Sequence, residues 1–490
     1  MSYLSRRSFL IGAGAGVGAV VLGACGSPSN SFSPASAVEE AERLRRQDGA
    51  PVRVVDLATV AGPVELGPLL VESWSYGGTV PGPEIRIRAG EVLQVRLRNQ
   101  LPTETTIHWH GIALRNDMDG VPGVTQDPIP AGGEFTYEFA VPDPGTYFFH
   151  PHVGVQLDRG LYGSLIVEDP DEPGGYDREV VMVLDDWTDG VGEAPDDILA
   201  RLTAGGMDHS GMGMGNEDSG MAMSDVLGGD AGDVMYPLYL INGRAANDPQ
   251  VIEANSGERL RLRIINAGSD TAFRLAVGGH SFTVTHSDGF PVMPVEGDAL
   301  LIGMGERYDL EVSMREGVTP VVAIAEGKGG RARLLIRAGT GEPPPAEHLP
   351  DELQGRLVTV DALAATARVE PKAAEPDRIH RLALDGDMMS YRWTINGDIW
   401  KGTLPLDVSS GERVRLEFDN RSTMFHPMHL HGHTFHMSLG GGARKDTVIV
   451  KPGQVLAADF EADNPGRWVV HCHNIYHAEA GMMTGLTYTP

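Results

Sequence analysis

Most of the histidines lie in four short clusters, two in the first third of the chain and two near its end. The clusters hold ten of the 17 histidines, and imidazole is a ligand that suits zinc, copper, iron and nickel. A single histidine is more often a core or surface group, but ten in clusters predict metal ligands. The clusters are His108-Trp109-His110-Gly111, His150-Pro151-His152, His426-Pro427-Met428-His429-Leu430-His431, and His471-Cys472-His473 followed by His477 and Met482.

The last cluster contains one of only two cysteines, and its neighbours indicate which metal is bound. A cysteine with two histidines and a weak axial methionine is the ligand set of a blue-copper electron-transfer site. Cys472, His477 and Met482 supply most of such a set, and His426 can complete it from a neighbouring strand. The usual zinc patterns, paired cysteines or His-Glu-x-x-His, do not occur in the sequence.

The His-Cys-His triplet can connect two metal sites. Successive side chains of a strand point to opposite faces, so His471 and His473 share one face and Cys472 takes the other. Cys472 can then hold a copper inside its own domain, while the two histidines face the His-x-His pairs of the first domain. An electron that arrives at the Cys472 copper needs only the adjoining backbone to reach the other metals. This arrangement couples one-electron oxidation to a site with several metals.

Two internal repeats indicate that the clusters belong to copies of one β unit. In the first repeat a Gly-Glu pair opens a strand, which ends at an asparagine after the same number of residues each time. The three copies run Gly90–Asn99, Gly257–Asn266 and Gly411–Asn420. In the second repeat Pro144–His152 aligns without gaps on Pro465–His473.

The repeats also separate the metal-binding copies from the third one. Nine residues past the repeat asparagine lie His108 in the first copy and His429 in the last, each opening a His-x-His pair. The same count in the middle copy reaches Leu275. A structural histidine would not need to recur in register, so we expect ligands in the outer copies and none in the middle one.

Three copies of a β unit predict an all-β protein of three consecutive Greek-key β-sandwich domains. Past residue 50, short alternations of Val, Ile, Leu and Arg are broken by Gly, Pro and Asn, with little helical periodicity. We place the domains at residues 50–170, 178–340 and 356–490, and the Pro-rich stretch Gly341–Pro350 marks the second boundary. A length of 490 residues suits two to four domains.

The charge of the chain excludes one class of partner. Its 39 basic and 67 acidic residues give a formal net charge of −28, whereas nucleic-acid binding needs a basic face. The acidity could help to attract cations, although solubility alone would account for it. We therefore expect no nucleic acid among the partners of this chain.

The first 25 residues have the pattern of an export signal. Ser5-Arg6-Arg7-Ser8-Phe9-Leu10 matches the twin-arginine pattern, and the apolar run Ile11–Leu22 is too short for an ordinary transmembrane helix. Leu22-Gly23-Ala24-Cys25 resembles a bacterial lipobox, in which the cysteine is lipidated; the alternative is plain cleavage, with Cys25 incidental. We expect a cell-envelope lipoprotein on the outer side of the cytoplasmic membrane, or else in the periplasm or at the cell surface, with residues 26–50 as a tether.

Together the four clusters resemble those of the multicopper oxidases, the family of laccases and bacterial copper-efflux oxidases, over nearly all of the mature chain. The resemblance implies cupredoxin-like domains and four copper ions. It also implies a small-molecule or Cu(I) electron donor, from which four single electrons reduce one O2 to two waters. It implies a type 1 copper held by His426, Cys472, His477 and Met482, and a type 2 copper held by His108 and His429. It implies a type 3 pair held by His110, His150 and His473, and by His152, His431 and His471.

Two acidic residues are candidates for supplying protons. Asp119 matches an acid that the family is thought to use near the trinuclear site, although Asp119-Gly120 could equally be a simple turn. Many relatives carry two acids after the second type 1 histidine. This chain has Ala478 and Glu479 there, so only the second acid, Glu479, is present.

Methionines point to the electron donor. Met207, Met212, Met214, Met221 and Met223 crowd the Gly-rich insert at residues 205–223 of the middle domain. Thioethers are soft ligands that prefer Cu(I), but the insert could instead be a disordered loop of drifting composition.

A further methionine lies beside the first type 1 ligand. Met424 resembles a residue that contacts substrate Cu(I) in the copper-efflux oxidases, whereas the acid expected four residues before His426 is replaced by Ser422.

These observations leave three functions open. The first is a cuprous oxidase in copper tolerance, and the second is a laccase-like oxidase of phenols or aromatic amines. The third is a non-enzymatic protein that sequesters copper, although relatives without catalysis tend to lose copper ligands and this chain keeps all of them. Two-domain copper nitrite reductases lack this full ligand set, so we set that reaction aside.

Overall fold

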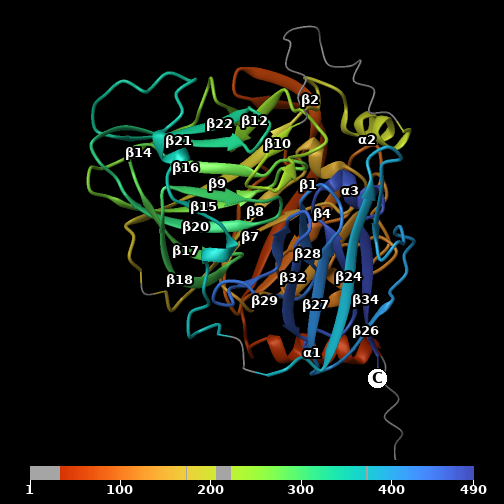
Figure 1. Ribbon diagram of the computed structural model, residues 1–490. Coiled ribbons are helices and arrows are strands. Elements are labelled where there is room, and N and C mark those ends of the chain that lie inside the picture. Colours follow the sequence, from red (N-terminus) through yellow and green to blue (C-terminus); the bar gives the residue numbers. More distant parts are fainter. Residues whose placement is uncertain (1–33, 173, 206–221, 371–373, 490) are drawn as a thin grey trace, which may run out of the picture.

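The computed structural model describes residues 34–172, 174–205, 222–370 and 374–489. Strands dominate these residues and helices are few, so the predicted all-β class is confirmed. In Figure 1 the chain runs from red and orange strands, through a yellow and green region, to cyan and blue strands. The export signal at residues 1–25 and most of the Met-rich insert, residues 206–221, lie outside the described residues.

The first domain consists of two four-stranded sheets. One sheet has the order β2-β1-β4-β6, and the other has the order β3-β8-β7-β5. Its strands are β1 (Val52–Leu66), β2 (Leu69–Tyr76), β3 (Ile85–Arg88), β4 (Val92–Gln100), β5 (His108–His110), β6 (Glu134–Ala140), β7 (Gly145–His150) and β8 (Gly163–Glu168). Alternate residues of β4 are buried because that strand covers the core with one face.

The second domain pairs a seven-stranded sheet, β13-β12-β9-β15-β20-β17-β18, with a six-stranded sheet, β14-β22-β21-β16-β19-β23. Its strands are β9 (Arg178–Trp187), β12 (Leu238–Ile241), β13 (Arg244–Ala245), β14 (Val251–Ala254), β15 (Arg259–Asn266), β16 (Phe273–Val277), β17 (Phe282–Ser287), β18 (Phe290–Gly297), β19 (Ala299–Ile302), β20 (Arg307–Ser313), β21 (Gly317–Ala325), β22 (Arg331–Ala338) and β23 (Leu357–Val358). Strand β23 falls within our expected third domain, but it pairs with β19 of the second. The chain therefore leaves the second domain later than we expected.

The third domain pairs a six-stranded sheet, β25-β24-β27-β32-β29-β30, with a five-stranded sheet, β26-β34-β33-β28-β31. Its strands are β24 (Arg378–Asp387), β25 (Arg392–Ile395), β26 (Leu406–Ser409), β27 (Arg413–Asn420), β28 (His426–Leu430), β29 (Phe435–Met437), β30 (Arg444–Lys445), β31 (Thr447–Val450), β32 (Val455–Glu461), β33 (Arg467–Cys472) and β34 (Met483–Thr489). Outside the large sheets lie the β10 (Met223–Ser224) and β11 (Gly229–Asp230) pair and the α-helices α1 (Pro34–Arg45), α2 (Pro195–Thr203) and α3 (Ile475–Glu479).

Helix α1 occupies part of the segment that we expected to be a tether. It lies beneath the blue strands of the third domain in Figure 1. The Glu42 carboxylate is buried and accepts hydrogen bonds from the backbone N–H of Ala140 at 2.9 Å and from Arg46 at 2.8 Å. The tether prediction is therefore wrong for residues 34–45. Local composition could not show this, because the docking partner is almost a hundred residues away.

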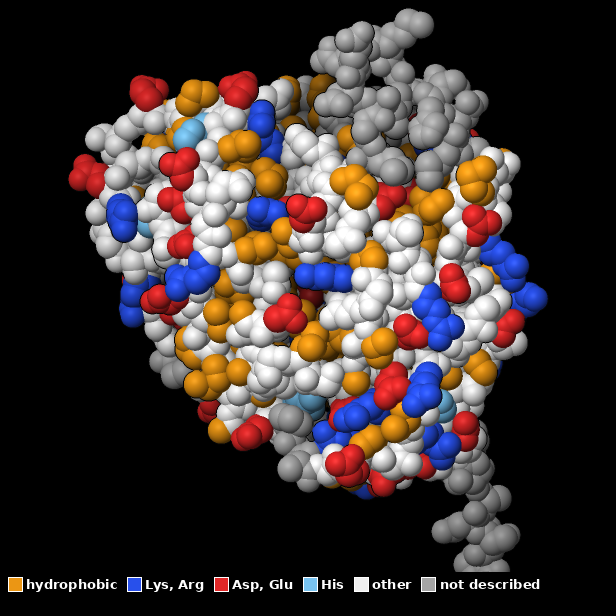
Figure 2. All heavy atoms as spheres, in the orientation of Figure 1, with side chains coloured by type: hydrophobic (Ala, Val, Ile, Leu, Met, Phe, Trp, Pro, Cys, Tyr) orange, Lys and Arg blue, Asp and Glu red, His pale blue; other side chains and the backbone are white. Residues whose placement is uncertain are grey.

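Positively and negatively charged side chains lie next to one another on the surface. On the face drawn in Figure 2, most Lys and Arg side chains of the described residues lie beside Asp or Glu side chains. None of the helices within the described ranges is long and apolar enough to cross a bilayer.

The three repeat asparagines have one structural role in all three domains. Asn99, Asn266 and Asn420 are fully buried, and each side-chain oxygen accepts a hydrogen bond from the backbone N–H two residues later. Each side-chain amide donates to a carbonyl in the following loop and to a carbonyl in a more distant segment. The asparagine thus fixes the loop that, in the outer domains, leads to the His-x-His pair.

We predict that Asn266→Ala destabilises the middle domain by about 3 kcal/mol, because three hydrogen bonds of about 1 kcal/mol each are lost. Urea unfolding would measure the change. The control is Asn255→Ala, at an exposed position of the same domain, for which we expect a change within about 0.5 kcal/mol. Equal stability of the two variants would show that the repeat asparagine has no structural role.

Candidate metal centres

The structure gathers the ten clustered histidines and Cys472 into two groups. One group contains Cys472, His426 and His477, and the other contains the remaining eight histidines. Strands β5 and β7 of the first domain supply ligand candidates, and so do β28, β33 and helix α3 of the third. All of these side chains are buried except His152, which is partly exposed.

The smaller group is a three-sided arrangement of one sulfur and two nitrogens. Cys472 Sγ lies 3.6 Å from His426 Nδ1 and 3.7 Å from His477 Nδ1, and the two nitrogens are 3.2 Å apart. Met482 is fully buried, and its carbonyl accepts a hydrogen bond from the backbone N–H of Cys472. The expected Cys-His-His set is therefore assembled, with Met482 close to it.

In each of these two imidazoles, the outer nitrogen, which is the ring nitrogen that faces away from the metal position, contacts an oxygen. His426 Nε2 lies 2.7 Å from Ser422 Oγ, and His477 Nε2 lies 2.9 Å from a carboxylate oxygen of Asp233. When Nε2 donates, Nδ1 keeps its lone pair and faces the sulfur. Burial lowers the pKa of His426 well below its usual range, and burial raises the pKa of the Cys472 thiol. Two imidazole nitrogens that converge on a buried thiol fit a metal that stabilises the thiolate.

The larger group lies between the first and third domains. His108 and His429 approach each other with their Nε2 atoms 3.4 Å apart, and His431 and His471 with theirs 3.0 Å apart. The ligand nitrogens of His152, His431 and His471 all lie within 4.8 Å of one another. The rings of His110 and His150 lie 4.9 and 5.3 Å from the ring of His473, between centroids.

Most histidines of this group have an outer nitrogen held by an oxygen. The Nδ1 atoms of five of them lie 2.8–3.0 Å from an oxygen and leave Nε2 free for a metal. These five are His108 beside the Asp119 carbonyl, His150 beside the Pro151 carbonyl, His429 beside the Asp446 carbonyl, His431 beside the Asp119 carboxylate and His471 beside the Cys472 carbonyl.

His110 is turned the other way. Its Nε2 lies 3.0 Å from an Asp446 carboxylate oxygen, and its Nδ1 has no partner. His150 Nε2, His152 Nε2 and both nitrogens of His473 are likewise buried without a hydrogen bond. Unpaired buried polar atoms are costly, and burial lowers the pKa of each of these four histidines, so they are neutral. Neutral imidazoles with unused nitrogens fit metal ions of the kind that the sequence predicts.

The two acidic candidates occupy different positions. Asp119 is fully buried, and its carboxylate lies 3.1 Å from His108 Nδ1 and 2.9 Å from His431 Nδ1. The following Gly120 has φ +82, and a Cβ there would lie 1.9 Å from the Ile107 carbonyl. Asp119 therefore holds two ligand candidates and also forms a tight turn.

Glu479 is instead exposed. It lines a cavity of about 310 Å³ that also reaches His152 and Glu104. His152 of the larger group and Glu479 thus line the same cavity, and a role for Glu479 in supplying protons stays a prediction.

Several residues around the groups carry no recognisable signal in the sequence. Asp233, from the middle domain, binds His477, and the Trp393 ring lies 4.0 Å from the His477 ring, between centroids. Asn474 caps helix α3 through its side-chain oxygen and donates to Asp270 of the middle domain at 2.5 Å. Only Asn474, inside the last cluster, could have been suspected, as a helix cap.

Comparisons with known proteins agree with this geometry. Family models described as "Multicopper oxidase" match residues 64–172, 178–320 and 373–490. The chain is 48% identical to "Multicopper oxidase MmcO" of Mycobacterium tuberculosis, over 99% of this chain and 96% of that protein. It is 29% identical to "Copper resistance protein A" of Pseudomonas syringae pv. tomato, with 98% of both chains covered. The L499M mutant of the laccase from B. aclada superimposes with a TM-score of 0.71 at 25% identity, covering 90% of this chain and 89% of that one, and supports the expected cupredoxin-like fold.

Proposed function

This chain belongs to the multicopper oxidase family, and from that premise we propose that it oxidises Cu(I) in copper tolerance. Membership makes it a copper-dependent oxidoreductase with oxygen as acceptor. The proposed reaction takes four Cu(I), one O2 and four protons to four Cu(II) and two waters. One observation carries the choice of donor: a row of methionine, carboxylate and methionine that leads from the surface to the strand bearing His426.

The proposal includes four resident copper ions. The type 1 copper is assigned to His426, Cys472, His477 and Met482, whose thiol and imidazoles converge as described. We assign the type 2 copper to His108 and His429, and the type 3 pair to the two triads that the family resemblance implies. These ions would supply the one-electron steps and the reduction of O2, while the protein holds and orients the imidazoles.

The row is built by short strand pairings. Met223 of β10 lies opposite Asp230 of β11, and Asp230 in turn forms a β-bridge with Met424. Residues opposite each other on neighbouring strands share a face, and such strands lie about 4.8 Å apart. Met223 is exposed, Asp230 is half-buried and Met424 is fully buried. Met424 is two residues before His426, so the row ends beside the type 1 ligands.

The chemistry of the row suits Cu(I). Thioethers bind Cu(I) in preference to harder ions, and a carboxylate attracts a cation on its way inward. Burial raises the pKa of Asp230 to about 6, so its carboxylate is charged above that pH. Asp233, which binds the outer nitrogen of His477, adds a second negative group nearby. The remaining methionines of the insert lie outside the described residues and stay a prediction.

An aromatic donor fits the described residues less well. Such a donor would need to reach the edge of a type 1 imidazole, but His477 is covered by Asp233 and by the rings of Tyr391 and Trp393. Tyr391 and Trp393 are 2% and 0% exposed, so among the described residues these two rings close off that edge and do not line an open pocket.

We also propose that the protein is exported by the twin-arginine pathway and anchored through lipid on Cys25. The support is the sequence pattern at Arg6-Arg7 and Leu22–Cys25. Durable anchoring needs more than one acyl chain, which bacterial lipoproteins generally carry.

For the donor, we predict that Met223→Leu, Asp230→Asn and Met424→Leu each lower kcat/KM for Cu(I) about tenfold, or about 1.4 kcal/mol. Turnover of a bulky outer-sphere dye should change much less, because the dye does not use the row. Oxygen uptake by the copper-loaded enzyme measures both rates.

The matched controls are Met293→Leu, exposed on β18, and Met437→Leu, buried on β29. They should alter neither rate. Equal losses on both donors would mean that the row variants damage the type 1 centre. No loss on Cu(I), with efficient phenol turnover, would favour the laccase function, and no oxygen uptake with any donor would favour copper sequestration.

For the anchor, we predict that Cys25→Ala releases the protein into the soluble fraction or blocks its processing. The change removes the sulfur that would carry lipid but leaves the twin-arginine pattern intact. Membrane fractionation followed by immunoblotting tests this. Identical fractionation of wild type and variant would exclude the lipobox.

A further inference from the structure

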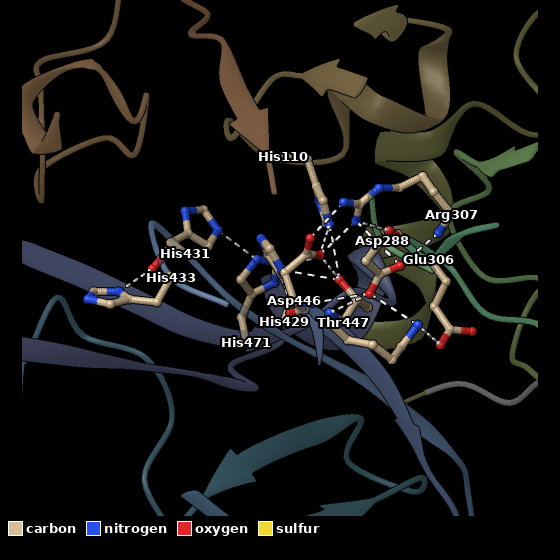
Figure 3. A network of polar contacts seen from close by, with 12 residues as sticks. His110, Asp288, Glu306, Arg307, His429, His431, His433, Asp446, Thr447 and His471 are labelled. Atoms are coloured by element: carbon tan, nitrogen blue, oxygen red, sulfur yellow. Dashed lines mark hydrogen bonds and ion pairs between the residues drawn. The ribbon is translucent and has the colours of Figure 1, made fainter. Parts of the chain in front are cut away.

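The middle domain supplies none of the expected ligands, but it places a group of buried charged side chains against the larger group of eight histidines. We call this larger group the trinuclear site, because it is assigned the type 2 copper and the type 3 pair. Figure 3 shows this network, with Arg307, Asp288 and Glu306 reaching toward Asp446 and its neighbours in the third domain. The charged side chains in it are at most 2% exposed. Burial of a charged side chain is costly unless the charge is paired and hydrogen-bonded. The presence of several such side chains at this interface therefore calls for an explanation.

Arg307 is the part of the network that crosses the domain interface most directly. Its two terminal nitrogens donate to the two carboxylate oxygens of Asp446 at 2.7 and 2.6 Å. The guanidinium also donates to the carbonyls of Thr146 and Gly305, both at 3.1 Å. A planar guanidinium held at four points fixes both the position and the plane of the carboxylate.

Asp446 passes this constraint to two ligands. Its carboxylate faces Nε2 of His110 at 3.0 Å, and its backbone carbonyl faces Nδ1 of His429 at 2.9 Å. Thr447 Oγ1 lies 3.0 Å from His110 Nε2 and 3.1 Å from His429 Nδ1. Because this contact occupies Nε2 of His110, its Nδ1 is left for the metal, whereas the five histidines held at Nδ1 leave Nε2.

Neighbouring groups hold the same segment from behind. Asp288 accepts hydrogen bonds from the backbone N–H groups of Asp446 and Thr447, at 3.2 and 3.1 Å. Its other carboxylate oxygen accepts from the backbone N–H of Arg307 at 2.9 Å. Lys445 bridges Asp288 and Glu306 at 3.1 and 3.2 Å. The segment that carries Asp446 is therefore tied to the middle domain along its backbone as well.

Two glycines leave room for the contact. A Cβ on Gly111, in the first histidine cluster, would lie 2.5 Å from an Arg307 nitrogen and 2.6 Å from an Asp446 oxygen. A Cβ on Gly305, in the middle domain, would lie 2.8 Å from the His473 ring and 3.0 Å from the His110 ring. The backbone before Arg307 thus packs directly on trinuclear histidines.

We propose that Arg307 is a positioning residue for the trinuclear copper site. It acts from the middle domain through Asp446 and fixes the orientation in which His110 binds metal by Nδ1. Because the guanidinium holds both oxygens of Asp446, one of these oxygens stays against Nε2 of His110 and leaves Nδ1 for the metal. Removal of Arg307 frees Asp446 to rotate, and His110 then loses its fixed orientation.

The experiment compares Arg307→Gln and Arg307→Lys with Arg261→Gln. Arg261 is the matched control, since it is a buried arginine of the same domain in a two-point contact with Asp309, and no histidine of the metal groups touches it. The readouts are copper per chain after dialysis against a chelator, the blue type 1 absorption and the type 2 EPR signal. The type 1 colour also reports whether the third domain has folded.

We expect Arg307→Gln to keep the type 1 colour but to hold the trinuclear coppers about 10–100-fold more weakly, with an altered or absent type 2 signal. Arg307→Lys keeps the charge but not the two-point contact, so its loss should be smaller. Arg261→Gln should keep wild-type copper content even if it unfolds at a lower temperature.

Wild-type copper retention and an unchanged type 2 signal in both Arg307 variants would overturn the proposal. So would an equal copper loss in Arg261→Gln, which would reduce the effect to general destabilisation. If Arg307→Gln does not fold, Arg307→Lys decides between these outcomes. The proposal rests on the four-copper assignment but not on the donor: a wild-type protein that binds only one copper would refute that assignment before any variant is compared.

Discussion

Imidazoles packed nitrogen to nitrogen in the interior are the constraint on which the rest of the structure depends. Lone pairs that face each other at 3.0–3.4 Å repel, and buried nitrogens without partners are costly. Metal ions remove both costs, but only if every ring turns the correct nitrogen inward. Most outer nitrogens are therefore held by an oxygen, which comes from a backbone carbonyl, a carboxylate or a hydroxyl.

This constraint explains the division of work among the domains. The outer domains carry the ligand candidates on short strands, where the period of two places alternate residues on one face. The middle domain supplies charges and acceptors instead: Asp233 to His477, Arg307 to Asp446, and Asp270 to Asn474. A domain without ligand candidates thus contributes to both metal groups, since Asp233 contacts His477 directly and Arg307 acts on His110 through Asp446.

The sequence was sufficient for the ligand candidates because their spacing is local, and a strand converts local spacing into a shared face. The repeat asparagines could be recognised for the same reason. Asp233, Arg307 and Asp446 could not, since each acts on a histidine far from it in the chain, and an isolated Asp or Arg looks like any surface charge. Helix α1 and strand β23 were missed in the same way: each is held by partners distant in sequence, so composition near residues 34–45 and 357–358 said little.

The central claim is that two buried groups hold four coppers in a set geometry, and anomalous diffraction at the copper edge from crystals of the loaded protein tests it most directly. The account predicts one peak bounded by Cys472 Sγ and the Nδ1 atoms of His426 and His477. It predicts three more peaks among the other eight histidines, one of them in contact with Nδ1 of His110. A single peak, or a peak at Nε2 of His110, would contradict the account.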